Sequence, residues 1–145
     1  MTTVYSAALM AHNAHPEYKY QLDCPTHTHE GVNPNCGDAI VLSARLGEGV
    51  IEEVAFTGHG CAVSQASTDI MANEVTDCTF AEAKAKGRAF LRMIAGDATD
   101  EDLALLGEAA ELQSISMMPA RVKCAELGWR TLLALLDEVE PEAGA

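Results

Sequence analysis

The sequence predicts an α+β fold in which helices cover one face of a small antiparallel sheet. Period-two alternation of apolar and polar residues is confined to the stretch between residues 26 and 56, whereas stripes with steps of three and four residues follow from residue 62 to 139. This segregation of strands from helices is typical of α+β folds. The 145 residues fit a single domain, 1–145, and a hydrophobic fraction of 48% allows a packed core without disulfides.

The first half of the chain supplies the strands. An Ala-rich segment at residues 4–13 predicts a helix that ends at His15-Pro16. Residues 18–30 contain a Thr-His-Thr-His alternation that suits an edge strand, and the Asn-Pro-Asn at 33–35 predicts a turn. Residues 39–46 and 50–56 then read as two strands, and the Gly-Glu-Gly turn between them predicts an antiparallel hairpin.

The second half supplies the helices. Apolar residues at helical spacing predict helices over 62–74 and 80–94, and residues 97–111 predict a short helix with a solvated acidic face. The last helix starts at Pro119 and carries a regular apolar stripe, after which residues 138–145 read as a frayed acidic tail. Because aromatic residues make up only 5% of the chain, aliphatic and Met side chains are expected to fill the core.

The charge balance excludes several kinds of partner. Nine basic residues against 22 acidic ones give a net charge of −13, which repels nucleic acids and anionic membranes. No apolar run approaches the ~20 residues of a membrane span. The first ten residues lack the basic segment of a secretory signal, so a cytoplasmic location is expected.

Three of the five cysteines stand where a site can form. Cys36 follows the Asn-Pro-Asn turn, Cys61 directly precedes a predicted helix, and Cys124 lies in the first turns of the last helix. Helix starts favour thiolates through unpaired N–H groups. An odd cysteine count in a reducing compartment favours metal or thiol chemistry over disulfides, although three small buried side chains are the plainer alternative.

A carboxylate completes this set. Asp38 lies two residues after Cys36, so in an extended or turn geometry both side chains can meet one cation. With Cys61 and Cys124 the donors are three thiolates and one carboxylate, which suit tetrahedral Zn²⁺ or an iron–sulfur cluster. Such a site is closed, and therefore structural, unless one ligand can leave.

Two basic residues flank the third cysteine. Arg121 and Lys123 can offset the negative charge of a metal–thiolate centre and orient an incoming anionic sulfur species. The alternative is that both are solvated residues at the start of a helix.

Three segments resemble the iron–sulfur assembly family that includes IscU, SufU and the N-terminal domain of NifU. The family's NPxCGD motif is matched by Asn33-Pro34-Asn35-Cys36-Gly37-Asp38. Its GxGCxxSxAS segment is matched by Gly58-His59-Gly60-Cys61-Ala62-Val63-Ser64-Gln65-Ala66-Ser67. The P-x-R-x-K-C-A segment of the SufU branch is matched by Pro119-Ala120-Arg121-Val122-Lys123-Cys124-Ala125. The resemblance covers about residues 5–136. Lys123 stands where IscU-type members have a His, and the acidic stretch 97–111 lies in the interval that SufU lengthens, so both features favour the SufU branch.

The resemblance implies a three-stranded sheet and a zinc site formed by Cys36, Asp38, Cys61 and Cys124. It also implies a partner, a PLP-dependent cysteine desulfurase of the SufS type, whose persulfide sulfur is passed towards cluster assembly. In that family a His of the desulfurase takes the zinc, and the cysteine that matches Cys36 is freed as the sulfur acceptor. Exchange chemistry requires such a released thiolate as its nucleophile.

The chain also departs from the family pattern. Residues 15–20 differ from the stretch that often follows the first helix in this family. This departure concerns docking of the partner and not metal binding. His59 occupies a variable position and is expected to be an exposed loop residue rather than a substitute ligand. Cys24 and Cys78 match no motif and are interpreted as buried or partly exposed small residues. His27 and His29 lie on one face of the predicted edge strand, and a second metal site there is the less favoured interpretation.

Three functions remain open at this point. The first is a zinc-dependent sulfur acceptor, a sulfurtransferase-like protein rather than a stand-alone enzyme. The second is a scaffold on which a [2Fe–2S] cluster is built and passed to apo-proteins, with Asp38 as the labile ligand. The third is a zinc-stabilised binding module without a role in sulfur chemistry.

Overall fold

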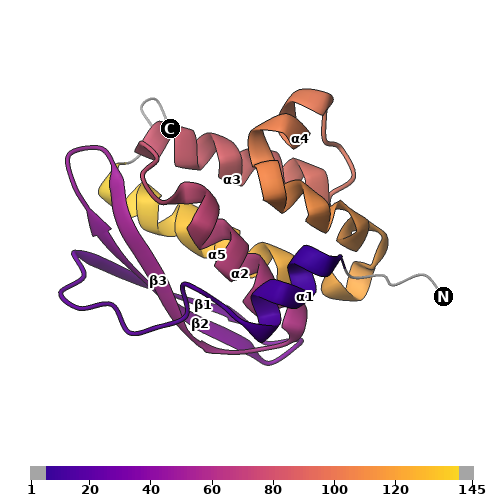
Figure 1. Ribbon diagram of the computed structural model, residues 1–145, viewed down its shortest axis with the longest axis horizontal. Helices are drawn as coiled ribbons and strands as arrows, with labels where there is room; N and C mark the ends of the chain where they lie inside the picture. The colour runs from indigo at the N-terminus through magenta and orange to yellow at the C-terminus, as the bar shows by residue number, and fades with distance from the viewer. Residues whose placement is uncertain (1–5, 141–145) are drawn as a thin grey trace.

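The computed structural model describes residues 6–140 and consists of a three-stranded antiparallel sheet covered by helices on one face (Figure 1). The strands β1 (His27–Asn33), β2 (Asp38–Leu46) and β3 (Ile51–His59) lie in the order β1-β2-β3. The helical elements are α1 (Ala7–Ala14), α2 (Ala62–Val75), α3 (Phe80–Ile94), α4 (Asp100–Leu106), the 3₁₀ helix η1 (Gly107–Met117) and α5 (Pro119–Val139). The predicted fold class is confirmed.

Two strands differ in extent from the prediction, because β1 spans His27–Asn33 instead of 18–30 and β3 extends beyond residue 56. Strand β1 begins only at His27, because the chain before it runs past the opposite edge of the sheet, where Tyr18 O accepts a hydrogen bond from Phe56 N–H at 2.9 Å. Strand β3 continues three residues beyond Phe56, because His59 still pairs with Ala39 of β2. Both strands that flank β2 therefore reach the end of the sheet where the cysteines lie.

Local sequence signals set the helix starts. Thr79 and Thr99 each begin a capping box, in which the Thr hydroxyl and an acid three residues later, Glu82 or Asp102, satisfy each other's backbone N–H groups. Cys61 caps α2 through its sulfur, and Pro119 occupies the first turn of α5.

The acidic stretch differs from the single solvated helix that the sequence predicts. Helix α4 ends at Leu106, and the chain continues as the 3₁₀ helix η1 from Gly107, whose φ is 56°. Asp102 is buried and accepts hydrogen bonds from Arg92, with an Nη2–Oδ1 distance of 2.7 Å. The guanidinium of Arg92, followed by the Thr99 backbone N–H, lowers the pKa of Asp102 well below its usual value. This part of the chain thus packs on α3 as well as facing solvent.

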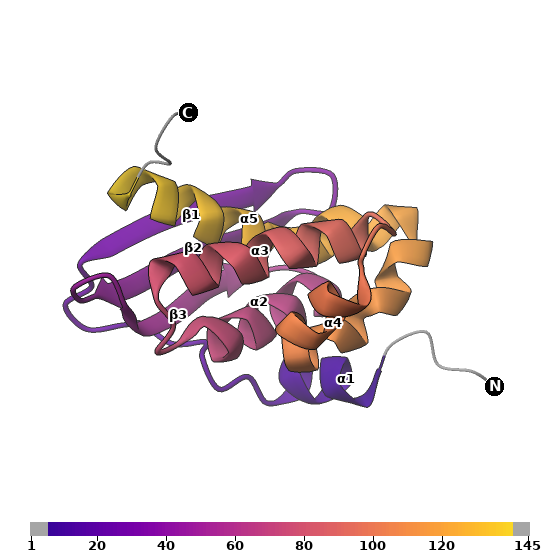
Figure 2. The ribbon, with the colours of Figure 1, turned by 90° about the horizontal axis from the view of Figure 1, so that it is seen from above.

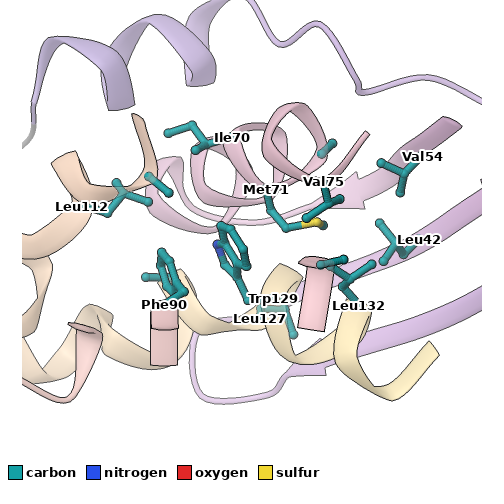
Figure 3. Close-up of a cluster of buried hydrophobic side chains, with 14 of the residues drawn as sticks. Leu42, Val54, Ile70, Met71, Val75, Phe90, Leu112, Leu127, Trp129 and Leu132 are labelled. Atoms are coloured by element: carbon teal, nitrogen blue, oxygen red, sulfur yellow. The ribbon is translucent and has the colours of Figure 1, made fainter. Parts of the chain in front are cut away.

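The core lies between the sheet and the helices, and most of its side chains are aliphatic (Figure 3). Phe90 and Trp129 stack in its centre with ring centroids 4.6 Å apart. Met71 and Met93 are fully buried, in line with the expectation that aliphatic and Met side chains fill the interior. Among the described residues, no helix has both the length and the apolar character that crossing a membrane requires.

Helix α5 lies against both β1 and α2 (Figure 2). Two glycines allow this close approach: a Cβ on Gly128 would lie 2.5 Å from Thr68 Oγ1, and a Cβ on Gly31 would collide with Thr131 Oγ1. The helix runs through Val139, two residues into the segment expected to fray, and the Glu138 carboxylate pairs with His29 at 3.0 Å. This seating fixes Cys124 against the end of the sheet.

Candidate metal centre

Three segments distant in sequence meet at one end of the sheet. Antiparallel pairing places Asn33 opposite Asp38 and Ala39 opposite His59, so the β1–β2 turn lies beside the end of β3. Helix α2 begins two residues after β3, directly behind Cys61. The first turns of α5 supply Cys124, and each segment therefore brings a cysteine to this end of the fold.

A tight turn presents Cys36. Its backbone N–H donates to Asn33 O at 3.3 Å, which closes a four-residue turn with Pro34 in the second position that proline favours. Gly37 follows with a φ of 71°, a conformation that L side chains rarely adopt. The Cys36 sulfur consequently points back towards α5, 3.1 Å from Cys124 Sγ.

Potential ligand atoms of Cys36, Asp38 and Cys124 all lie within 4.8 Å of one another. Asp38 and Cys124 are completely buried, whereas Cys36 is partly exposed. In the part of the chain that the structure describes, no other group of three such residues gathers this closely.

Cys61 borders this group without belonging to it. Its backbone N–H donates to Asp38 Oδ1 at 2.9 Å, while its sulfur accepts from Ser64 N–H at 3.5 Å as the N-cap of α2. Cys61 also interacts with the Cys124 thiol. The fourth predicted ligand is therefore adjacent to the other three, with its sulfur directed towards the first turn of its own helix.

The hydrogen bonds given to the Asp38 carboxylate come from neutral groups. Oδ1 receives the Cys61 N–H, and Oδ2 receives the side-chain amide of Asn33 at 3.3 Å. A fully buried carboxylate surrounded by neutral donors and thiols is costly unless a cation offsets its charge. Burial, followed by hydrogen bonds with Cys36, Asp38 and Cys61, raises the pKa of the Cys124 thiol far above its usual value. The donor set therefore fits a thiophilic cation such as zinc.

Gly60 leaves space for the carboxylate. A Cβ at this position would lie 2.5 Å from Asp38 Oδ1 and would collide with Ser64 Oγ. Only a residue without a side chain allows the β3–α2 connection to pass this close to Asp38, which is a physical reason for the Gly between His59 and Cys61.

A pocket of about 310 Å³ opens beside Cys36 and is lined by Asn33, Asn35, Cys36, Pro119, Ala120 and Lys123. A second pocket of about 350 Å³ adjoins it along β1 and α5 and shares Asn33, Asn35 and Lys123 with it. Lys123 is exposed at the border of both pockets, whereas Arg121 is partly buried on the first turn of α5. The cluster is thus reached from solvent on the Cys36 side.

The remaining candidates lie outside the cluster. His59 is exposed, as expected, and Cys78 is partly buried with its sulfur 3.4 Å from Glu74 O. Cys24 differs from the expectation, because it is exposed in the loop before β1, where it adopts a φ of 50°. His27 and His29 share a face of β1, but His29 pairs with Glu138, and no second cluster of ligands forms there among the described residues.

Sequence reasoning did not identify Asn33 as part of the centre. Its side chain is 5% exposed, and its amide contacts both Asp38 and Cys124. The pairing of the hairpin offered a signal, because the residues that flank a four-residue turn stand opposite each other across the two strands.

Fold and site together define a small α+β domain with a cluster of two cysteines and a carboxylate, bordered by a third cysteine, at one end of its sheet. The model of the NifU-like N-terminal domain matches residues 4–132. The chain belongs to this family, the IscU/SufU/NifU-N proteins of iron–sulfur cluster assembly.

Individual relatives cover most of the chain. It is 35% identical to the iron–sulfur cluster assembly scaffold protein IscU of Streptococcus pyogenes serotype M1, over 89% of this chain and 80% of that protein. It is 33% identical to the zinc-dependent sulfurtransferase SufU of Bacillus subtilis, over 91% of this chain and 88% of that protein. The crystal structure of FiSufU from Fervidobacterium islandicum AW-1 superposes with a TM-score of 0.86 at 32% identity, covering 92% and 96% of the two chains.

Proposed function

We propose that this protein is a zinc-dependent sulfur acceptor that takes persulfide sulfur from a SufS-like cysteine desulfurase during iron–sulfur cluster assembly. Cys36, Asp38, Cys61 and Cys124 would hold the zinc. The zinc-dependent sulfurtransferase SufU among its relatives supports this role, as does the Lys that precedes Cys124. The bound ion would keep its cysteine ligands as thiolates at neutral pH.

The observation that carries the proposal is the unequal exposure of the cluster. Cys124 and Asp38 are fully buried, whereas Cys36 lies on a turn at the mouth of a pocket of about 310 Å³. The Cys36 sulfur lies 3.1 Å from Cys124 Sγ and 3.9 Å from Ala120 O. Because Cys36 packs at the edge of the core and also lines the pocket, its side chain can turn outwards while the fully buried residues stay packed.

The transfer needs no oxidant or reductant. The Cys36 thiolate attacks the terminal sulfur of the persulfide on the donor cysteine, and a new sulfur–sulfur bond forms on Cys36. The old sulfur–sulfur bond breaks, and its electron pair leaves with the donor cysteine as a thiolate. Cys36 then carries the persulfide for the next acceptor.

Lys123 would assist this step electrostatically. Its side chain is exposed at the border of the pocket that contains Cys36, in a chain of net charge −13. A positive charge there attracts an anionic persulfide towards the acceptor. Arg121, two residues earlier, would add to the same field.

The experiment is a desulfurase assay with zinc-loaded protein and a SufS-type enzyme. Cys36→Ala is expected to abolish stimulation of the desulfurase, while Cys24→Ala leaves it intact. Cys24 is the matched control, because it is an exposed cysteine at the opposite end of β1, roughly 20 Å of strand away. Full stimulation by Cys36→Ala would overturn the proposal.

A scaffold for a [2Fe–2S] cluster is the second candidate. Asp38 favours it, because an oxygen ligand beside thiolates is a weak point from which a cluster can leave, and the IscU of S. pyogenes carries the scaffold name. Anaerobic reconstitution followed by transfer to an apo-protein tests this function. A colourless protein that retains zinc against excess iron excludes it.

The same assays address a zinc-stabilised binding module without a role in sulfur chemistry. In that case chelation of zinc would destabilise the fold, yet wild-type protein would leave desulfurase turnover unchanged.

A further inference from the structure

Asn33 stands between the two buried candidate ligands. It is the last residue of β1 and is 5% exposed. Its Nδ2 atom donates to Asp38 Oδ2 at 3.3 Å and lies 3.6 Å from Cys124 Sγ, a hydrogen-bond distance for sulfur. One amide group therefore contacts two of the proposed ligands.

The chemistry of an amide matches this arrangement. A side-chain amide has two N–H donors and no charge, so it can give one hydrogen bond to each ligand without replacing the cation. The other Asp38 oxygen already accepts the Cys61 N–H at 2.9 Å. Each carboxylate oxygen thus receives one hydrogen bond and keeps a lone pair for a metal.

The backbone fixes this amide in place. Asn33 pairs with Asp38 across the β1–β2 hairpin, and its carbonyl oxygen accepts the Cys36 N–H that closes the turn. The position of the amide is therefore set by the sheet, not by a flexible loop. Asn35, in the same turn, is exposed.

We propose that Asn33 is a positioning residue that orients Asp38 and Cys124 for the metal ion. This inference rests on the proposed zinc site and assigns a role to a residue that is not itself a ligand. Hydrogen bonds from such outer residues typically contribute a factor of about 10–100 to metal affinity. The hydrogen bonds of the amide go to Asp38 and Cys124, the two fully buried candidate ligands, so Asn33 holds both in position when Cys36 turns outwards.

The test measures zinc affinity by competition with a chromophoric chelator, together with the absorption spectrum of Co²⁺-substituted protein. Asn33→Ala removes both hydrogen bonds, and Asn33→Asp keeps the shape while replacing the donor with a carboxylate oxygen. Asn35→Ala is the matched control for zinc affinity. Each variant is also made in the Cys36→Ala background, in which metal binding depends on the remaining candidate ligands, including the buried Asp38 and Cys124.

The expected result is a loss of zinc affinity of about 10–100-fold for Asn33→Ala and at least as much for Asn33→Asp. The Co²⁺ ligand-field bands should shift in both variants, and the loss should persist in the Cys36→Ala background. Wild-type affinity and an unchanged Co²⁺ spectrum would overturn the inference, as would failure of both variants to fold, which would make Asn33 structural. A wild-type protein that does not bind zinc would instead overturn the proposed function.

Discussion

Two buried carboxylates in this protein obtain their partners in different ways. Asp69 of α2 is fully buried, and its Oδ2 lies 2.6 Å from His12 Nδ1 while its Oδ1 accepts Tyr18 N–H at 2.8 Å. The other ring nitrogen of His12 lies 2.9 Å from Glu108 Oε1. Asp38, equally buried, accepts hydrogen bonds from the neutral Asn33 amide and Cys61 N–H and also interacts with the Cys124 thiol.

The two carboxylates differ in whether the protein itself provides a basic side chain to balance the negative charge. In the His12 cluster (His12, Asp69 and Glu108) the protein itself supplies a group that can carry the positive charge. Burial opposes protonation of His12, but the hydrogen bond with Asp69 and the charge of Glu108 raise its pKa above the usual value. The groups that hydrogen-bond with Asp38 are an amide, a backbone N–H and a thiol, and the proposed zinc would supply a positive charge. The first cluster should hold without metal, and the second should depend on it.

The largest expected effect is that of zinc on stability. Free zinc at about 1,000 times its Kd should raise the free energy of unfolding by about 4 kcal/mol, because only the folded chain assembles the site. Urea titrations with zinc and with a chelator measure this difference. Asp38→Ala should strongly reduce this effect of zinc. If the free energy of unfolding of the wild-type protein did not change with zinc, the proposed difference between the Asp38 and Asp69 sites would be wrong.

The next largest effect concerns the His12 cluster. His12→Gln should lower the free energy of unfolding of metal-free protein by about 2–3 kcal/mol, because it leaves Asp69 buried without its cation. His15→Gln is the matched control, since His15 is exposed just beyond α1. The zinc affinity of both variants should equal that of the wild type. A large loss of zinc affinity in His12→Gln would show that the two clusters are coupled.

Gly60→Ala should act mainly on the metal centre. Its Cβ would displace Asp38, and we expect a loss of zinc affinity of about 10–100-fold with a smaller effect on metal-free stability. Gly47→Ala serves as control, because Gly47 lies on the β2–β3 turn and the atoms that its Cβ would meet belong to the flexible side chain of Glu52. Chelator competition measures both affinities, and equal values for the two variants would count against the Asp38 contact.

The smallest effect is a pH dependence. The folded-state pKa of His12 is raised above 6.5, so its contribution to stability is fully present below pH 6.5 and is lost as the pH rises through the folded-state pKa. The slope of the free energy of unfolding against pH should not exceed about 1.4 kcal/mol per pH unit for this one group. Urea titrations of wild type and His12→Gln in chelator should converge with rising pH, and a difference that grows with pH would contradict the assignment.

The fold was largely predictable, because residue periodicity reports burial and the capping residues mark helix starts. The Thr79 and Thr99 capping boxes were readable from their spacing to Glu82 and Asp102. The start of β1 was predicted too early, because Tyr18 and Lys19 lie beside Phe56 of β3 and the chain reaches β2 only near Thr26. The 3₁₀ helix η1 has no comparable sequence signal.

The site was predictable only in part. The motifs identified Cys36, Asp38 and Cys124, which the fold brings together, but not the sulfur direction of Cys61, which depends on the geometry of the α2 N-terminus. The His12 cluster escaped sequence reasoning, because its members lie 57 and 96 positions apart and none of them belongs to a motif. Long-range polar contacts of this kind are fixed by packing, not by local pattern.

The most direct test of the account is zinc K-edge X-ray absorption on the zinc-loaded protein. The account predicts four ligands, with three sulfur atoms at about 2.3 Å and one oxygen at about 2.0–2.2 Å. Asp38→Ala should retain the three sulfur atoms and change only the oxygen contribution. A zinc shell with two sulfur atoms or fewer in wild-type protein would contradict the account, because it would leave Cys61 outside the metal centre.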